Sequence, residues 1–451
     1  MTADHDPAPE PSVVLAAKSD AVCRMGALML GAGTGSYRVK AAMGRVAAAL
    51  GIDDLEAQVS LNEIVATTRS NGTFRTQVVE AGPPVVNADR IRALLRVSLR
   101  ARPGLEAADL QRRLDRVERR GPLFRPSAVV AGGAAACAAF AFLNNGRWQE
   151  CLAAGIAAGL GKSAQLLMHR RFRLNQLAVI ALTAAVACVA YLLCADLLRS
   201  LAGSSASPLH EAAFTSAILF LVPGFPLLTA ALDLARFDFG AGISRLLYAT
   251  MITLAAALGA WVAASAFGLA PAEIEPPALP PAVLLTGRVL ASAVGIVGFA
   301  VTFNTPPRMA LAASLIGTAA NVPRMFAVDA GANPLLCATA GTLAVGLLAA
   351  WVSQRLAAPR IILSVPAVLI MIPGASTYRA LVAVIDRDPL SALANGSESL
   401  GVLLGLAGGL VIARMLTDSA WNSPTPHWTQ MPRTHAQEVL RARDPDRRAG
   451  D

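Results

Sequence analysis

Two similar segments, each with a proline followed by glycine inside an apolar stretch, are the first candidates for a functional site. VPGFPLLTAALDLARFD occupies residues 222–238, and IPGASTYRALVAVIDRD occupies residues 372–388. At a constant offset of 150 residues they share Pro223/Pro373, Gly224/Gly374, Ala230/Ala380 and Asp238/Asp388. Proline within a helix frees a backbone carbonyl, and glycine beside it lets the chain turn. The pair therefore predicts two interrupted helices whose ends could hold a small polar ligand. An ordinary proline kink is the alternative for either motif alone.

Side chains near these breaks could complete a binding site. The N-terminal end of a half-helix favours an anion, such as the carboxylate of a substrate. Four residues close to the breaks carry hydroxyl groups that could contact it: Thr229, Ser376, Thr377 and Tyr378. A substrate ammonium group would need carbonyls or a carboxylate, for which Asp233 and Asp238 are candidates. Both aspartates also fit a second role, as interface charges beside Arg236.

Arginines within apolar sequence are the next candidates. A charge at the bilayer centre costs on the order of 3 kcal/mol and persists mainly with a partner or a water path. Arg288, Arg324 and Arg379 lie in such positions, and Arg324 follows Asn321 and Pro323, a further pattern typical of a broken helix. We expect Arg324 or Arg379 to bind a carboxylate or to act in gating. Structural pairing is the alternative, with three candidate partners: Asp233, Asp196 and Asp386.

Other chemistry has little support in the sequence. No histidine lies within the apolar segments, so proton coupling would depend on Asp233 or Asp238. Asn62 and Glu63 could serve as acid or base but fit turn polarity better. The glycines of GAGTGS lack the spacing of a phosphate-binding loop, and GIAAGLGKS at 155–163 has Ile where a P-loop needs its first Gly. We therefore expect no enzyme activity, no metal and no cofactor.

The elements that must position these residues are membrane spans. The chain of 451 residues is 55% hydrophobic and 15% charged, with a mean hydropathy of +0.52, whereas soluble domains average about 25% charged residues. The first 126 residues hold 32 charges and the next 292 hold only 28. About twenty apolar residues cross a bilayer, which predicts ten spans, near 127–143, 148–168, 176–198, 212–232, 242–268, 282–303, 309–328, 334–353, 361–385 and 399–417.

The arginines between the spans predict their orientation, because connections rich in Lys and Arg stay in the cytoplasm. Most of these arginines follow even-numbered spans: Arg170, Arg171, Arg173, Arg236, Arg245, Arg308, Arg355 and Arg360. Both termini should therefore be cytoplasmic. Each Pro-Gly motif would fall in the fourth span of a five-span half, at 127–269 and 282–418. Since five is odd, the second half would be inverted relative to the first.

The N-terminal part, residues 13–126, predicts a small cytosolic α+β domain. Its expected elements are helices at 13–33 and 37–50, a β-hairpin within 55–82 turning at 71–73, a helix at 87–100 capped by Asn87, and a basic amphipathic helix at 105–120. The last helix leads into the first span and should lie along anionic headgroups. The leader at 1–12 and the tail at 419–451 are predicted to be disordered.

Several motifs together resemble the bacterial threonine/serine exporter family. They are GAGTGSYRVKAAMGRVAAALG, VSLNEIVATTR, FRTQVVEAGPPVVNADRI, LVPGFPLLTAALDLARFDFGAGISRLLYA, FNTPPRMALAASLIGTAANVPRM and VPAVLIMIPGASTYRALVAV. The resemblance covers residues 20 to 418 in consistent order. It implies a cytosolic N-terminal domain followed by ten spans, in the fused form of a family that also has members split into two proteins of about five spans.

The resemblance implies a secondary exporter of threonine and serine in the bacterial cytoplasmic membrane, driven by the proton-motive force. Its expected partners are a small amino acid, protons and the bilayer, without nucleic acid, and a homo-oligomer is left open. Split relatives are linked to succinate, so a dicarboxylate exporter is the first alternative; the intramembrane arginines allow it. A membrane-anchored enzyme or sensor domain is the second alternative. Ten spans with a repeated Pro-Gly motif argue against an anchor.

Overall fold

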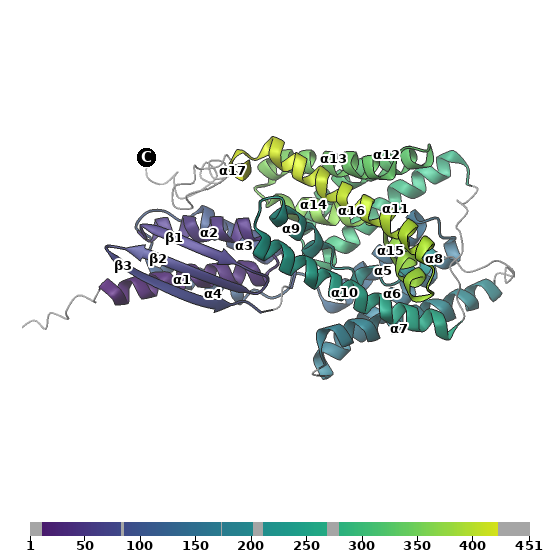
Figure 1. Cartoon of the computed structure of the whole chain (residues 1–451), viewed down its shortest axis with the longest axis horizontal. Coiled ribbons are helices and arrows are strands. Elements are labelled where there is room, and N and C mark those ends of the chain that lie inside the picture. Colours follow the sequence, from purple (N-terminus) through teal and green to yellow (C-terminus); the bar gives the residue numbers. More distant parts are fainter. Residues whose placement is uncertain (1–10, 83–84, 173, 202–210, 268–278, 423–451) are drawn as a thin grey trace, which may run out of the picture.

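The computed structural model describes residues 11–82, 85–172, 174–201, 211–267 and 279–422. These residues form an N-terminal domain at one end of a bundle of long helices (Figure 1). The predicted leader and tail lie mostly outside the described residues. The boundaries of both segments differ from the prediction. α1 already begins at Pro11, and residues Ser419–Asn422 form a short helix, α17, in which Trp421 is buried.

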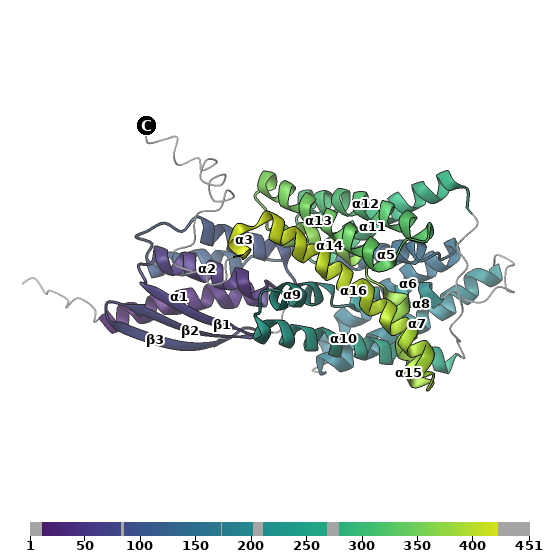
Figure 2. The same ribbon diagram turned by 45° about the horizontal axis from the view of Figure 1, so that its top comes forward.

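The N-terminal domain combines four helices with one antiparallel sheet, as the sequence predicts. Its elements are α1 (Pro11–Gly31), α2 (Ser36–Ala49), β1 (Asp54–Val59), β2 (Glu63–Ser70), β3 (Thr73–Glu80), α3 (Ala88–Leu99) and α4 (Ala107–Glu118). The GAGTGS segment joins α1 to α2, and Gly33 adopts a φ of +92° that glycine accepts without strain. α1 and α2 cover the sheet (Figure 2).

The sheet has three strands in the order β1-β2-β3, rather than the two of the predicted hairpin. The predicted first strand breaks at residues 60–62, where the amide of Ser60 donates to the carbonyl of Glu63 at 2.9 Å and closes a tight turn. Asn62 and Glu63 therefore serve this turn. The predicted second turn is present, with Asn71 and Gly72 both at positive φ, as a two-residue hairpin requires.

Helices α3 and α4 complete the domain. The predicted cap of α3 is present, because Asn87 Oδ1 accepts a hydrogen bond from the amide of Arg90 at 3.0 Å. α4, which the sequence suggested would lie along headgroups, has its apolar face buried within the domain. Its apolar residues Leu110, Leu114 and Val117 are buried in the core of the domain, so α4 packs against α1 and α3.

The remaining helices form two successive sets of the same pattern. The first set comprises α5 (Pro126–Leu143), α6 (Trp148–Arg171), α7 (Gln176–Leu201), the short α8 (Glu211–Ser216) and η1 (Leu219–Leu221), α9 (Gly224–Leu234) and α10 (Phe239–Ala266). The second comprises α11 (Pro281–Thr302), α12 (Pro307–Asp329), α13 (Pro334–Leu356), α14 (Arg360–Leu369), α15 (Gly374–Ile385) and α16 (Pro389–Thr417). In each set the fourth element is interrupted.

The helical part has the length and composition of a membrane protein. Within the described ranges, eight helices are long and apolar enough to cross a bilayer, and the bent pair α14 and α15 makes a ninth span if taken together. α9 is a shorter apolar helix, and with α8 and η1 it occupies the predicted fourth span. The predicted fold class, a polytopic α-helical membrane protein with a small N-terminal α+β domain, is confirmed.

The first helices of the two halves, α5 and α11, pack together in opposite directions. The amide of Leu123, just before α5, donates to Asn304 Oδ1, just after α11, at 2.8 Å. The start of α5 therefore lies at the end of α11. Gly132 and Gly298 face each other between them, and a Cβ on Gly132 would lie 3.1 Å from the carbonyl oxygen of Gly298. Antiparallel packing of equivalent helices is the arrangement that an inverted repeat requires.

Candidate transport site at the paired helix breaks

Pro223 and Pro373 interrupt the two halves with the same local geometry. Pro223 precedes α9 with φ −81° and ψ 57°, and Pro373 precedes α15 with φ −79° and ψ 70°. In each case the amide of the following glycine donates to the carbonyl two residues earlier, at 2.9 Å. These are the features of an inverse γ-turn. The second break turns the chain by 59° between α14 and α15.

The structural repeat continues to the ends of α9 and α15. Phe237 and Arg387, 150 residues apart, both adopt a left-handed conformation, with φ of 59° and 60°. The amides of Asp238 and Asp388 then donate to carbonyls five residues earlier, at 3.0 and 2.8 Å. The two segments that match in sequence at an offset of 150 residues therefore have the same backbone conformation, from the helix break to the end of the helix that follows it.

The two breaks lie against each other inside the bundle. A Cβ built on Gly224 would overlap the side chain of Leu369 and lie 3.3 Å from Cδ1 of Ile372, just before the second break. A Cβ on Gly374 would lie 3.9 Å from Cδ1 of Leu219, just before the first break. Buried apolar side chains, among them Phe140, fill the space between the breaks. The site is therefore closed in this conformation.

The close approach at Gly224 gives a stability prediction. Gly224→Ala should lower the thermal unfolding midpoint of the purified full chain, because Leu369 is only 1% exposed and has little room to move. Overpacking of this kind costs about 1–3 kcal/mol. Gly374→Ala is the matched control, since its nearest neighbours would lie 3.8 and 3.9 Å away, in ordinary contact. Equal midpoints for the two variants would contradict the packing described.

The N-terminal ends of α9 and α15 both begin at the breaks, so their positive helix-dipole ends point toward a common region. α9 ends against the N-terminal domain, whereas α15 ends far from it (Figure 2). The first amides of a helix have no partner within it. Pro226 removes one of these donors from α9, whereas α15 begins with Gly-Ala-Ser and keeps its donors. α15 is therefore the stronger anion-binding end.

The predicted hydroxyl groups lie within the first two turns after the breaks. Thr377 Oγ1 lies 2.7 Å from the carbonyl oxygen of Pro373 and 2.6 Å from Ser399 Oγ, which ties α15 to α16. Thr229 Oγ1 donates to the carbonyl of Phe225 at 3.0 Å. Ser376 is 6% exposed beside Thr377. These hydroxyl groups bond to backbone carbonyls in the closed conformation and would have to exchange partners to contact a substrate.

Tyr378 occupies a different environment from the one its sequence position suggested. Its ring packs against Phe214, with centroids 5.7 Å apart, and Phe214 packs in turn against Tyr191 at 5.9 Å. This aromatic cluster joins α15 of the second half to α7 and α8 of the first. In this conformation the Tyr378 ring contributes to packing between the halves.

Arg324 is the intramembrane cation best placed for a ligand. Its Nε donates to Asn321 Oδ1 at 3.0 Å, and Asn321 Nδ2 donates to Ser292 Oγ at 3.0 Å, forming a polar chain between α12 and α11. Gly341 makes room for its stem, since a Cβ there would lie 3.3 Å from Arg324 Cδ and 3.6 Å from Sδ of Met371, close to the second break. No carboxylate among the described residues pairs with Arg324.

The other two predicted arginines differ from Arg324. Arg288 Nη1 lies 2.5 Å from Asp329 Oδ2 and its guanidinium covers the ring of Phe326, so its charge is already balanced. Arg379 is partly buried on α15, five residues after Gly374. The break suggested by Pro323 is not present. α12 continues through it, because one proline removes a single amide donor from a helix of 23 residues.

Asp233 lies beside the N-terminal domain, away from the breaks. It is 3% exposed, and its Oδ2 lies 2.5 Å from Arg245 Nη1 while its Oδ1 accepts a hydrogen bond from Ser36 Oγ at 3.0 Å. Arg245 also donates to the carbonyl of Thr34 at 3.0 Å. Asp233 is therefore not the partner of Arg324. The GAGTGS loop approaches it closely, because a Cβ on Gly35 would lie 3.4 Å from Asp233 Oδ1.

Asp238 adds a second contact between the same elements. Lys40 Nζ lies 2.7 Å from Asp238 Oδ2, and the Ser36 hydroxyl, placed between the two aspartates, has its Oγ 2.8 Å from the same oxygen. Burial by itself would raise the pKa of Asp238, but the bonds from Lys40 and Ser36 outweigh it and hold this pKa below its usual value. Asp238 thus stays ionised at neutral pH, and its contribution to stability is lost only as the medium becomes acidic enough to protonate it.

These contacts hold the N-terminal domain against the α9–α10 turn. We call the five residues that make them the interdomain latch: Ser36, Lys40, Asp233, Asp238 and Arg245. Beside it, Arg236 covers the ring of Tyr37 at 4.1 Å and donates to the carbonyl of Trp421. No local pattern in the sequence signals the contacts that cross from the α9–α10 region to the N-terminal domain, since they join residues about 200 positions apart. Within the described ranges, no three His, Cys, Asp or Glu side chains come close enough to hold a metal ion.

Antiparallel five-helix halves that meet at paired helix breaks define a class of polytopic membrane transporters built from inverted repeats. The particular family follows from comparison with known proteins. The chain belongs to the threonine/serine exporter family: the family model described as "Putative threonine/serine exporter" matches residues 20–267, and that described as "Threonine/Serine exporter, ThrE" matches residues 288–416. The resemblance noted from the motifs is confirmed, and the protein is a membrane transporter.

Curated relatives carry two different substrate names. The "Probable succinate transporter subunit YjjP" of Klebsiella aerogenes is 29% identical over 50% of this chain and 84% of its own length. The protein of the same name from Escherichia coli is 28% identical over 54% of this chain and 92% of its own. The "Probable threonine/serine exporter" of Mycobacterium tuberculosis is 22% identical over 88% of this chain and 76% of its own. No solved structure matches the chain.

Proposed function

We propose that the protein exports threonine and serine across the bacterial cytoplasmic membrane, driven by the proton gradient, with both termini in the cytoplasm. The observation that supports this most strongly is the pair of matched breaks, Pro223–Gly224 and Pro373–Gly374, packed against each other between inverted halves. Such a pair can open alternately to either side, because each half offers the same path in the opposite direction. The chain matches the relative named as a threonine/serine exporter along most of its length.

The substrate carboxylate is proposed to bind between the N-terminal end of α15 and Arg324. The helix end supplies amides and Arg324 supplies a fork of donors suited to a carboxylate. Thr229, Ser376 and Thr377 would contact the substrate hydroxyl by exchanging their bonds to backbone carbonyls. The backbone carbonyls that these hydroxyl groups release would then accept hydrogen bonds from the substrate ammonium group. Asp233 is not available for this role, because it is paired with Arg245 in the latch.

Asp233 is the proposed proton-coupling residue. Its carboxylate is bound by both Arg245 and Ser36, so protonation would weaken two contacts between α9 and the N-terminal domain. Because α9 begins at the first break, a change at Asp233 can reach the substrate site along one helix of 11 residues. Asp238, which its surroundings keep ionised, is the weaker candidate of the two.

A dicarboxylate such as succinate is the second candidate substrate. Two observations favour it: relatives of higher identity are named as succinate transporter subunits, and no carboxylate of the described residues pairs with Arg324 to repel a second carboxylate of the substrate. A dicarboxylate would need a further cation beside Arg324, and Arg379 on α15 is the nearest in sequence to the second break.

Uptake into everted membrane vesicles distinguishes these substrates. Vesicles containing the full chain should accumulate labelled threonine and serine, and an uncoupler should abolish the accumulation. Vesicles without the chain are the control. If succinate accumulates in an uncoupler-sensitive manner while neither amino acid does, the ranking of the two substrates is reversed.

A further inference from the structure

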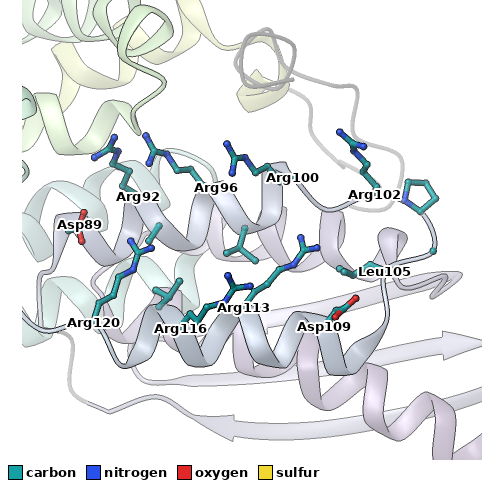
Figure 3. A pocket seen from close by; sticks show the side chains of 15 residues that line it. Asp89, Arg92, Arg96, Arg100, Arg102, Leu105, Asp109, Arg113, Arg116 and Arg120 are labelled. Atoms are coloured by element: carbon teal, nitrogen blue, oxygen red, sulfur yellow. The ribbon is translucent and has the colours of Figure 1, made fainter. Parts of the chain in front are cut away.

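A cleft of about 740 Å³ lies between α3 and α4 of the N-terminal domain, away from the helix breaks (Figure 3). Seven of its fifteen lining residues are arginines and only two are acids, Asp89 and Asp109. Three of the arginines stand on each helix or within two residues of its end, and the seventh lies in the connection: Arg92, Arg96 and Arg100 with α3, and Arg113, Arg116 and Arg120 with α4. Figure 3 shows the arginines of each helix as a row, with the row of α4 extending toward α3.

The helical period explains how so many arginines face one cleft. The three of α3 are four residues apart, which places them on one side at intervals of about 6 Å. The apolar sides of both helices are buried in the domain core through residues such as Leu94 and Leu114. Two helices packed through their apolar sides therefore leave their basic sides open to the cleft between them.

The arginines of α3 have no carboxylate partner to balance their charge within the described residues. Among the described residues, no carboxylate pairs with Arg92, Arg96 or Arg100, and Asp109 pairs with Arg112 outside the cleft. The Nε atoms of Arg92 and Arg96 are buried without a hydrogen-bond partner. Burial lowers the pKa of both groups, yet arginine remains charged at neutral pH. A bound anion would balance the charge of these guanidinium groups and reduce the repulsion between the rows.

We propose that this cleft binds a soluble anion carrying two or more phosphate groups. Guanidinium groups bind phosphate through paired hydrogen bonds. Cations repeated at intervals of one helical turn on two facing helices suit a chain of phosphates better than a single one. The volume lies in the range of small-molecule sites. None of the fifteen lining residues is aromatic, so recognition rests on phosphates rather than on a stacked base.

The direction of the cleft favours a soluble ligand over a lipid headgroup. α3 begins next to the membrane helices, where the amide of Ala88 donates to the carbonyl of Phe303 at 2.9 Å. From there α3 extends for 12 residues, about 18 Å, away from the bundle. Arg92 and Arg100 stand at opposite ends of α3 (Figure 3), so a ligand that contacts the whole row must extend away from the bundle. Anion binding would also fix α3, whose first turn is bonded to the α11–α12 connection.

Calorimetric titration of the full chain in phosphatidylcholine nanodiscs tests this proposal, with sodium tripolyphosphate as the probe and orthophosphate for comparison. Tripolyphosphate should bind saturably, at least about tenfold more tightly than orthophosphate, and more weakly as salt rises. Arg96→Gln and the exposed Arg100→Gln should each weaken binding about tenfold. Arg119→Gln is the matched control, an exposed arginine at the end of α4 outside the cleft, and should leave the affinity unchanged.

Absence of saturable binding, equal affinity for the two probes, or equal loss in Arg119→Gln would overturn the proposal. Thermal unfolding of each variant without ligand separates lost binding from lost folding, and Arg100→Gln changes a side chain exposed at the cleft end. Nanodiscs containing cardiolipin distinguish the source of the phosphate. Tripolyphosphate binding that persists in these discs and still depends on Arg100 supports a soluble ligand. Loss of tripolyphosphate binding in these discs would assign the cleft to lipid headgroups.

Discussion

Replacing Arg324 by Gln is expected to reduce transport of threonine into everted vesicles by at least about tenfold, with the amount of protein in the membrane unchanged. Hydrogen bonds to a charged group contribute about 1.5–3 kcal/mol, and about 1.4 kcal/mol corresponds to a factor of ten. Arg324 has its Nε bonded to Asn321 and no carboxylate partner among the described residues, so a substrate carboxylate is the natural partner of its remaining donors.

Arg308→Gln is the matched control, because Arg308 is an exposed arginine at the start of the same helix, α12. It should transport as the unmodified protein does. Arg324→Lys keeps the charge but loses the fork of donors, so its transport rate should lie between those of Arg324→Gln and Arg308→Gln. Normal threonine transport by Arg324→Gln would remove Arg324 from the substrate site.

Asp233→Asn is expected to lower the thermal unfolding midpoint and to abolish transport driven by a pH gradient. Arg245, 4% exposed, would remain buried without its carboxylate, and breaking a buried pair in this way costs about 3–5 kcal/mol. Exchange of labelled for unlabelled threonine needs no net proton movement and should continue. Reconstituted vesicles, assayed with and without an imposed pH gradient, measure both activities.

The double variant Asp233→Asn/Arg245→Gln separates stability from coupling, because it removes the unpaired charge as well. It should recover most of the lost stability and still fail to respond to the pH gradient. Asp386→Asn, at an exposed aspartate just after α15, is the control and should behave normally. Transport that still follows the pH gradient in Asp233→Asn would show that the coupled proton binds elsewhere.

Local signals in the sequence predicted the parts of the fold that depend on local chemistry. Proline fixes its own φ and glycine lets the chain turn, so the repeat at an offset of 150 residues predicted both breaks, and the structure shows their matching angles. Asn87 was predictable as a helix cap because its side chain bonds an amide only three residues later. The strand break at residues 60–62 was not, because Val59 and Leu61 keep the apolar alternation up to the turn and the turn itself is closed by backbone hydrogen bonds.

Long-range pairings escaped prediction from sequence. Asp233 meets Ser36, 197 positions away, only because the N-terminal domain is packed against the α9–α10 turn. The arginines of α4 were visible as a basic stripe, but their facing partners on α3 depend on how the two helices pack. Without that packing the stripe suggested a membrane surface. A continuous α12 through Pro323 shows the converse, that a local signal can be overridden within a long helix.

Substrate protection of an engineered thiol at the breaks tests the central claim most directly. In a chain whose six native cysteines are replaced, Ser376→Cys places a thiol at the start of α15 and Arg308→Cys places one on the exposed start of α12. Threonine or serine should slow maleimide labelling of the Ser376→Cys protein during transport and leave labelling of the Arg308→Cys protein unaffected. Equal labelling of the Ser376→Cys protein with and without threonine, in vesicles that still transport it, would contradict a substrate site at the paired breaks.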